Sequence, residues 1–146
     1  MALPTPPVEM SRDDETGAIA AATYFLTDLY TYTVTSHDTS GWIGMSHSLC
    51  VYCKTVSSAV SAEANEGATT TPGVISVVAT RSEAFSALAF GAKLDVHIDR
   101  TVKRSQSGEV VGERPASEAT MAAVVVRQGN HWLIRGVDVL PFGADS

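Results

Sequence analysis

The most chemically distinctive residues of this sequence are its two cysteines, Cys50 and Cys53, in the segment HSLCVYC. A C-x-x-C pair can form a redox centre, supply half of a zinc site or close a local disulfide. A structural zinc site needs four ligands, and His47 is the nearest candidate for a third. A thioredoxin-like centre follows a strand, whereas here the pair follows a predicted helix. Zinc and redox chemistry are therefore disfavoured, but the pattern alone leaves the choice open.

A second group of polar residues, Asp95, His97 and Asp99, alternates along a predicted strand, so that all three face one way at spacings of about 7 Å. As an acid/base cluster, it would hold a histidine between two carboxylates, which raise the pKa of an imidazole. As a surface, it would continue the polar row of Lys93 and Lys103. We favour the solvated surface, because one polar face is common in antiparallel sheets.

No catalytic or cofactor-binding motif accompanies these residues. The sequence contains no G-x-S-x-G nucleophile elbow, phosphate-binding P-loop or H-E-x-x-H zinc motif. We therefore predict no catalytic residue, no cofactor and no metal ligand.

The composition of the 146 residues indicates one globular domain. Apolar residues make up 45% and charged residues 18%, which argues against disorder. The net charge is -6 and Lys and Arg form no run, so we expect no nucleic-acid partner. No apolar stretch reaches the roughly 18 residues of a membrane-spanning helix.

The elements that position these residues begin with a long helix. The S-x-x-D pattern from Ser11 to Asp14 predicts its cap, and an apolar stripe at helical spacing carries it to about Val34. A short second helix is expected from Asp38 to Met45.

The cysteines belong to the start of a third helix, capped by Ser46 or Ser48 and stopped by Gly67. Its apolar stripe places Cys53 inward and leaves Cys50 off the buried side. The stripe consists of Leu49, Cys53, Val56, Val60 and Ala64.

After residue 73 the apolar period changes from that of a helix to that of a strand. Residues 74–80 predict one strand, and residues 88–102 predict a long one that is bent or interrupted, with Gly91 as the expected bulge. Residues 120–140 predict a hairpin. The polar stretches between these strands are predicted to be loops, at residues 68–72 and 105–116. Three helices followed by about four antiparallel strands indicate an α+β fold, with the helices packed on a curved sheet.

Residues 14–67 resemble an actinobacterial lipoprotein family designated domain of unknown function 6318. Its members combine a lipobox signal, a proline-rich linker, a G-A-x-A-x-x-Y/F helix, a T/S-x-D-T turn and a C-x-x-C pair. The matching positions here are Gly17-Ala18, Tyr24-Phe25, Ser36-His37-Asp38-Thr39 and Cys50/Cys53.

The closing hairpin carries a second resemblance. Its G-x-x-W-x-I pattern, at Gly129, Trp132 and Ile134, is similar to the last hairpin of the cone-shaped nuclear-transport-factor-like superfamily, which includes ketosteroid isomerase. This resemblance implies a cone, in which a curved sheet wraps around the helices.

The lipoprotein resemblance implies an exported protein, lipid-anchored at the outer face of the cytoplasmic membrane. It divides the sequence into a proline-rich linker at residues 1–12, one cone-fold domain at residues 13–142 and a tail at residues 143–146. The three prolines of the linker favour an extended segment without packing of its own. We expect the signal and the lipidated cysteine to be encoded upstream of this sequence.

For an exported protein with two cysteines and none spare, a disulfide between Cys50 and Cys53 is the favoured chemistry. Side chains three residues apart on a helix have Cβ atoms about 5–6 Å apart, and a disulfide needs about 3.5–4.5 Å. The first turn of the third helix must therefore be tightened. We expect a structural bridge that pins this helix to the first one, with Cys50 as the more exposed sulfur.

The cone resemblance also implies a pocket between the helices and the concave sheet face. The aromatic residues that could line it are Tyr24, Tyr30, Tyr32, Trp42 and Tyr52. Isomerase-type proton transfer would need a tyrosine paired with an aspartate. The inward row of the long strand holds no carboxylate, and Asp28 and Asp138 have no supporting pattern.

We therefore expect a non-enzymatic domain that binds a cell-envelope protein or a small apolar ligand. The alternative is a small-molecule enzyme of isomerase, hydrolase or cyclase type that uses a Tyr/Asp pair in the cone. Contact with a membrane is expected only through the lipid anchor. A weak homodimer is expected through the sheet face that carries Ala87, Ala89 and Gly91.

Overall fold

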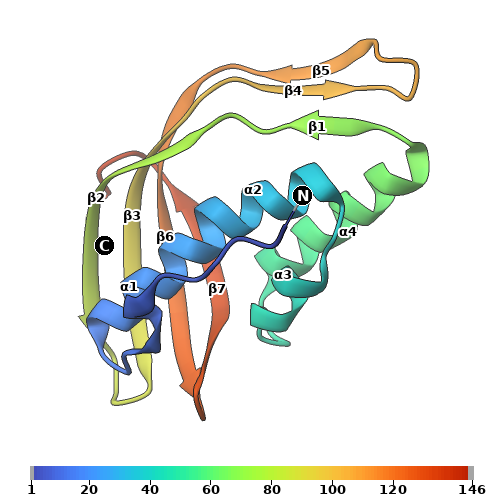
Figure 1. The fold of residues 1–146 in the computed structure, drawn as a ribbon. Helices are drawn as coiled ribbons and strands as arrows, with labels where there is room; N and C mark the ends of the chain where they lie inside the picture. The colour runs from blue at the N-terminus through green and yellow to red at the C-terminus, as the bar shows by residue number, and fades with distance from the viewer. Residues whose placement is uncertain (1, 145–146) are drawn as a thin grey trace.

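The computed structural model describes residues 2–144, in which a helical half is followed by strands that curve around it (Figure 1). The helices are η1 (Val8–Ser11), α1 (Glu15–Tyr24), η2 (Phe25–Leu29), α2 (Tyr30–Ser36), α3 (Ser40–Met45) and α4 (Val51–Glu66). The strands are β1 (Thr69–Thr71), β2 (Ile75–Ala84), β3 (Ala89–Ile98), β4 (Thr101–Arg104), β5 (Val110–Arg114), β6 (Ser117–Gln128) and β7 (His131–Leu140). The predicted α+β class is confirmed.

The first predicted helix is continuous through α1, η2 and α2, and η2 is a single π-helical turn. Its cap is Asp14, whose Oδ1 accepts the amide N–H of Gly17 at 3.1 Å. The prediction that Ser11 is the cap is wrong, because this residue ends η1 and its hydroxyl donates to the carbonyl of Val8.

The helices α3 and α4 also follow in the predicted order, but α4 begins after the predicted serine caps. Its N-cap is Cys50, whose Sγ accepts the amide N–H of Cys53 at 3.1 Å. Gly67 ends the helix, as predicted, with a left-handed φ of 72° that glycine adopts without steric cost. Leu49 and Ala64, predicted to face inward, are exposed, because Leu49 precedes the helix and Ala64 lies off its buried stripe.

The seven strands of the described residues form two antiparallel sheets, with the orders β2-β3-β6-β7 and β1-β4-β5. Three long runs of chain, β1–β2, β3–β4 and β5–β6, cross from one sheet to the other, and β7 is the fourth run (Figure 1). The predicted curved sheet of about four strands is therefore present, but its ladder is interrupted where it bends. The smaller sheet arches over α2 and α4 (Figure 1). It contains β1 and β5, which occupy the predicted loops 68–72 and 105–116.

The corner between the sheets is built by a close approach of two backbones. A Cβ on Gly73 would lie 1.9 Å from the carbonyl oxygen of Asp99, so glycine is required there. The long predicted strand breaks at this corner, between β3 and β4. The bulge predicted at Gly91 is absent, since this residue pairs regularly with Val124.

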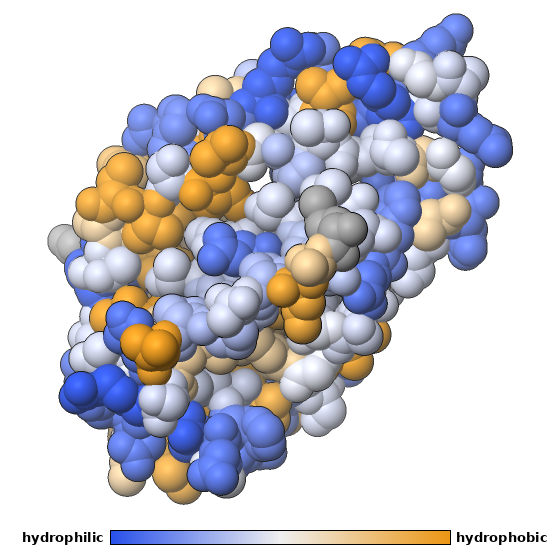
Figure 2. Space-filling view, viewed as in Figure 1, coloured by the Kyte–Doolittle hydropathy of each residue, from blue (hydrophilic) through white to orange (hydrophobic). Residues whose placement is uncertain are grey.

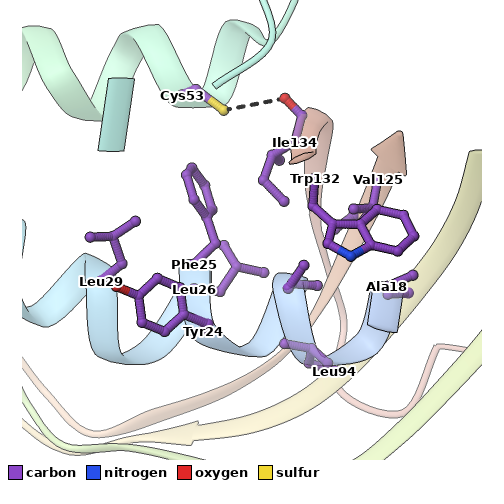
Figure 3. Close-up of a cluster of buried hydrophobic side chains, with 14 of the residues drawn as sticks. Ala18, Tyr24, Phe25, Leu26, Leu29, Cys53, Leu94, Val125, Trp132 and Ile134 are labelled. Carbon is purple, nitrogen blue, oxygen red and sulfur yellow. Dashed lines mark hydrogen bonds between the residues drawn. The ribbon is translucent and has the colours of Figure 1, made fainter. Parts of the chain in front are cut away.

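The core lies between the first helix and the concave face of the larger sheet (Figure 3). Its largest fully buried side chains include Trp42, Phe25, Leu29, Leu94 and Ile134. The predicted inward row of β3 is buried from Phe90 to Val96, whereas Leu88, which precedes the strand, is exposed.

An ion pair that the alternation does not predict lies on the outer face of the larger sheet. Asp95 is buried rather than solvated. Arg81 donates to both of its carboxylate oxygens, at 2.7 and 3.1 Å, and the hydroxyl of Thr120 donates to one of them at 2.5 Å. The C-terminal segment covers the pair: the amide of Gly143 donates to Oγ1 of Thr120 at 2.9 Å, and Arg81 donates to the carbonyl of Ala144 at 2.7 Å. Arg81 first, and then Thr120, lowers the pKa of Asp95 to about 2.

The chain itself partly covers the sheet face that is predicted to pair in a homodimer. Gly91 lies beneath Phe85, since a Cβ on this glycine would be 2.9 Å from the phenyl ring. Ala89 is half-buried and Ala87 is exposed. Further along the same face lies the buried Asp95 with its C-terminal cover.

The proline-rich lead packs against the domain, although the sequence predicts no packing. The carbonyl of Pro4 accepts the hydroxyl of Tyr24 at 2.6 Å. The carbonyls of Met10 and Arg12 accept the indole N–H of Trp132 at 2.9 and 3.2 Å. The lead therefore runs along the first helix as far as β7 (Figure 1). The predicted linker and tail also include residues outside the described range, Met1, Asp145 and Ser146.

Hydrophobic side chains gather on the visible surface near the start of β2 (Figure 2). Val74 and Val78 are the exposed large hydrophobic residues of that segment. Within residues 2–144, no helix is both long enough and apolar enough to cross a membrane.

Candidate functional site

Cys50 and Cys53 form the predicted disulfide, with Cα atoms 5.3 Å apart. Both residues are buried, at 0% and 1% exposure. The prediction that Cys50 is the more exposed sulfur is therefore wrong. As the extended N-cap of α4, Cys50 turns its side chain back over the first turn of the helix instead of outward.

The bridge fastens the start of α4 to β7. The Sγ of Cys53 lies 3.9 Å from the carbonyl oxygen of Ile134 (Figure 3), which also accepts the amide N–H of His47 at 2.9 Å. Trp42 links the bridge to the first helix, because its indole N–H donates to the carbonyl of Cys53 at 2.9 Å and its ring stacks on Phe25. The bridge thus joins the start of α4 to β7, and it lies in the same buried cluster as residues of the first helix.

The aromatic residues predicted to line one pocket are distributed over different environments. Trp42 is fully buried in the core. Tyr30 and Tyr52 flank it, with ring centroids 5.9 and 6.2 Å from the ring of Trp42. The hydroxyl of Tyr24 instead donates to the carbonyl of Pro4 in the N-terminal lead. Of these four, Tyr30 lines the groove described below.

A tyrosine–aspartate pair exists, formed by Tyr32 and Asp38. The hydroxyl of Tyr32 donates to Oδ2 of Asp38 at 2.7 Å, which raises the pKa of the tyrosine and lowers the pKa of the aspartate. Oδ1 accepts both the amide and the hydroxyl of Ser40 at the start of α3. Asp38 is exposed and lies one residue before the N-cap Thr39, so the pair holds the turn before α3 and does not line the groove described below. Asp28 and Asp138 are exposed as well.

The polar row of Asp95, His97 and Asp99 is divided between two environments. Asp95 is buried against Arg81, as described above. His97 and Asp99 lie 3.2 Å apart on the exposed surface. The row therefore does not form one acid/base cluster.

A groove of about 380 Å3 opens between the helices and the smaller sheet. One wall comes from α2 and α4, and it is mainly apolar, formed by Tyr30, Val34, Val56, Ala59, Val60 and Glu63. The other wall comes from β1, β4 and β5, and it is polar, formed by Thr70, Thr101, Lys103, Gly112, Glu113 and Arg114. The groove therefore lies between the helices and the strands that curve over them, where a pocket is predicted from the sequence.

The polarity of the sheet wall follows from the break in the long strand. Leu94 and Val96 of β3 are buried beneath the helices, whereas Thr101 and Lys103 of β4 line the groove. The break moves the alternation by one residue, and such a shift turns the opposite set of side chains inward. Val102, predicted to point inward, is thus replaced by its polar neighbours.

One carboxylate, that of Glu63, interrupts the apolar helix wall. Its Oε1 lies 3.0 Å from Nε2 of His37, and its Oε2 accepts the hydroxyl of Thr70 at 2.6 Å. Burial raises the pKa of Glu63, but the bonds from Thr70 and His37 outweigh burial and leave the pKa below its usual range. His37 ends α2 with a left-handed φ of 63°, which is uncommon for a residue other than glycine. The network therefore joins α4 to β1 and to the end of α2.

Glu63, Lys103 and Arg114 were not predicted from the sequence. A signal for Glu63 exists, because it follows Val56 and Val60 at positions i+7 and i+3 on the same helical stripe. The two cations give no such signal, since their inward direction depends on the bend between the sheets.

No known protein family matches the sequence, and no curated protein matches it either. The solved structures with a similar fold include those of three proteins. The intermembrane space region of the chloroplast protein ARC6 is 11% identical over 84% of this chain and 96% of its own, with a TM-score of 0.63.

The other two are bacterial proteins. A protein with a cystatin-like fold from Caulobacter vibrioides is 9% identical over 86% of this chain and 88% of its own, with a TM-score of 0.55. The protein Aln2 from a Streptomyces species is 13% identical over 96% of this chain and 94% of its own, with a TM-score of 0.53. At these identities the similarity shows a shared fold, the helices lying inside a curved antiparallel sheet.

Proposed function

We propose that this domain is a non-enzymatic binding module that holds a small, largely apolar ligand in the groove. The observation that carries the proposal is the contrast between an apolar helix wall and a polar sheet wall across about 380 Å3. Small-molecule sites are typically concave and apolar, with a few placed polar groups and volumes of roughly 300–1,000 Å3. A protein partner would need a much larger surface, since stable interfaces bury about 1,200–2,000 Å2.

Binding is favoured over catalysis because both carboxylates that line the groove are already engaged, Glu63 as described next and Glu113 by Arg100. Both oxygens of Glu63 are bonded, to His37 and to Thr70. A general base needs a lone pair within reach of the proton that it removes. The Tyr32–Asp38 pair holds the turn before α3 and does not line the groove.

Ala59→Phe tests the site, because Ala59 is exposed on α4 and lines the groove. Ala64→Phe is the matched control, since Ala64 is exposed on the same helix and does not line the groove. With octanamide as the probe, we expect NMR shifts at Val56 and Val60 in the wild type and in Ala64→Phe. In Ala59→Phe, the bulky ring should weaken binding by about tenfold or more, which is about 1.4 kcal/mol. Equal binding by all three proteins, or none by the wild type, would overturn the proposal.

We also propose that the protein is exported and lipid-anchored, as in the lipoprotein family that residues 14–67 resemble. The family-like motifs of the first helix and the turn at residues 36–39 support this proposal. The disulfide supports it as well, because disulfides persist mainly in oxidising compartments. Expression of the complete gene in its own host with an alkyne fatty acid tests it. Labelled protein in the membrane fraction is expected, and unlabelled cytoplasmic protein would contradict the proposal.

A small-molecule enzyme of isomerase, hydrolase or cyclase type is the second candidate. Tyr30 and Glu63 favour it, because both line the groove. Burial, and less strongly the charge of Glu63, raises the pKa of Tyr30. Mass spectrometry of a ligand recovered from the host and incubated with the protein distinguishes the two functions. Chemical conversion that Glu63→Gln abolishes would establish the enzyme, and recovery of the unchanged ligand would support binding.

A further inference from the structure

Among the charged side chains that line the groove, all but Arg114 have a side-chain ion-pair or hydrogen-bond partner within residues 2–144. The pairs are Glu63 with His37, Lys103 with Glu66, and Glu113 with Arg100. Arg114, on β5, makes no side-chain hydrogen bond or ion pair with any residue of that range. One cation of the polar wall is therefore available to a ligand.

Two hydroxyl groups lie near this guanidinium. Tyr30 lines the groove, and both Tyr30 and Tyr52 flank Trp42. Neither hydroxyl has a hydrogen-bond partner in the described part of the chain. Burial raises the pKa of both tyrosines, and the positive charge of Arg114 partly offsets that rise in both. Both hydroxyls are therefore neutral donors at physiological pH, close enough to Arg114 to respond to its charge.

We infer that the groove selects an amphiphilic anion, whose carboxylate binds Arg114 while its apolar body lies along the helix wall. This inference rests on the ligand-binding function proposed above. A guanidinium donates two parallel N–H bonds to a carboxylate, and the hydroxyl of Tyr30, which lines the groove, can donate to a remaining lone pair. The valines of the helix wall, Val34, Val56 and Val60, then cover the apolar body.

The charges of the groove disfavour the other classes of head group. A cationic head group would approach Arg114 and meet carboxylates that are already paired, those of Glu63 and Glu113. A neutral head group would leave the guanidinium without a counter-charge. The net charge of the chain is -6, so attraction of an anion depends on this local group and not on the field of the whole protein.

Three probes with one apolar chain test the head group: octanoate, octanamide and octylammonium, each titrated by NMR at neutral pH and low salt. Octanoate is expected to bind about tenfold more tightly than octanamide, because charge-assisted hydrogen bonds are about twice as strong as neutral ones. Octylammonium is expected to bind most weakly. The variant Arg114→Gln should remove the preference for octanoate over octanamide. Arg135→Gln, an exposed position on β7 with the same change in net charge, should retain the preference.

Each outcome separates this inference from the function on which it rests. If the three probes bind the wild type with equal affinity, the anion selectivity is wrong and the binding function stands. The same holds if octylammonium binds best, or if Arg114→Gln retains the preference for octanoate. If none of the probes shifts the signals of Val56 and Val60, the binding function itself is wrong.

Discussion

Trp42 donates its indole N–H to the backbone carbonyl of Cys53, 2.9 Å away in the interior of the protein. This bond joins α3 to the first turn of α4, where the disulfide is closed. The Trp42 ring also stacks on Phe25. The disulfide, α3 and the first helix are therefore connected through Trp42 and form one packed unit. The apolar side of the groove is built on this unit, since α2 and α4 supply its lining.

Removal of the disulfide should loosen this unit without unfolding the domain. For Cys50→Ser/Cys53→Ser, we expect a loss of about 2 kcal/mol or less in the free energy of unfolding, because the closed loop contains only about four residues. Urea denaturation of the oxidised wild type and of the variant measures the loss. Dithiothreitol should lower the stability of the wild type but not that of the variant.

The same bridge should exchange slowly with glutathione, because both sulfurs are buried. Its reduction potential and exchange rate can be measured in glutathione buffers. A potential near that of thioredoxin, about -270 mV, together with rapid exchange, would contradict a structural role.

Truncation of Trp42 should be among the most damaging single changes in the core. Trp42→Ala removes a fully buried ring and its hydrogen bond, and we expect a loss of about 3–5 kcal/mol in the free energy of unfolding. The neighbouring Ile43→Ala is the matched control, because Ile43 is 56% exposed on the same helix, and its effect should stay within about 0.5 kcal/mol. Denaturant titration of both variants measures the difference, and equal losses would contradict the placement of Trp42.

The helices and the closing hairpin could be predicted from the sequence because local signals define them. The helices are marked by their apolar period, and the acidic cap Asp14 and Gly67 mark where the first helix begins and where α4 ends. The Gly129-Asn130 turn lies between the two strands of the hairpin. The bend in the long strands has no comparable local signal. It depends on the contact of Gly73 with the carbonyl of Asp99, residues that are distant in sequence.

The error about the groove follows from that bend. If the break between β3 and β4 is not known, one continuous alternation places Val102 inward and Lys103 outward. The polar wall of the groove could therefore not be predicted. The burial of Asp95 in an ion pair could not be predicted for a similar reason. Its partners Arg81 and Thr120 lie on neighbouring strands, and only the register of the sheet brings them to it.

Gly17 should resist substitution, although alanine is the better helix former. A Cβ on Gly17 would lie 2.0 Å from the carbonyl oxygen of Arg12, so Gly17→Ala must push the packed N-terminal lead away. We expect a loss of about 1–3 kcal/mol, as for overpacking. Gly44→Ala is the matched control, since nothing lies within 4 Å of its Cβ on α3, and it should gain roughly 0.5–1 kcal/mol. Thermal unfolding compares the two, and a gain for both would show that the lead is not packed in solution.

The Arg81–Asp95 pair should make the protein sensitive to acid. The folded pKa of Asp95, about 2, lies below its ordinary value of 3.8, so the pair stabilises the fold fully above about pH 4. This contribution should disappear as the pH falls through about 2, because the unfolded chain then binds more protons than the native one. Asp14, with a pKa also lowered to about 2, should add to the same loss.

Asp95→Asn isolates the share of this carboxylate. Its stability deficit relative to the wild type, measured by urea denaturation at several pH values, should be largest above pH 4. The deficit should shrink toward pH 2, where the wild-type carboxylate becomes protonated too. Asp99→Asn is the control, because Asp99 is exposed near the same end of the strand, and it should differ little from the wild type at every pH. A deficit for Asp95→Asn that does not change with pH would mean that the amide disturbs packing alone, and the ion pair would then not be the source of the acid sensitivity.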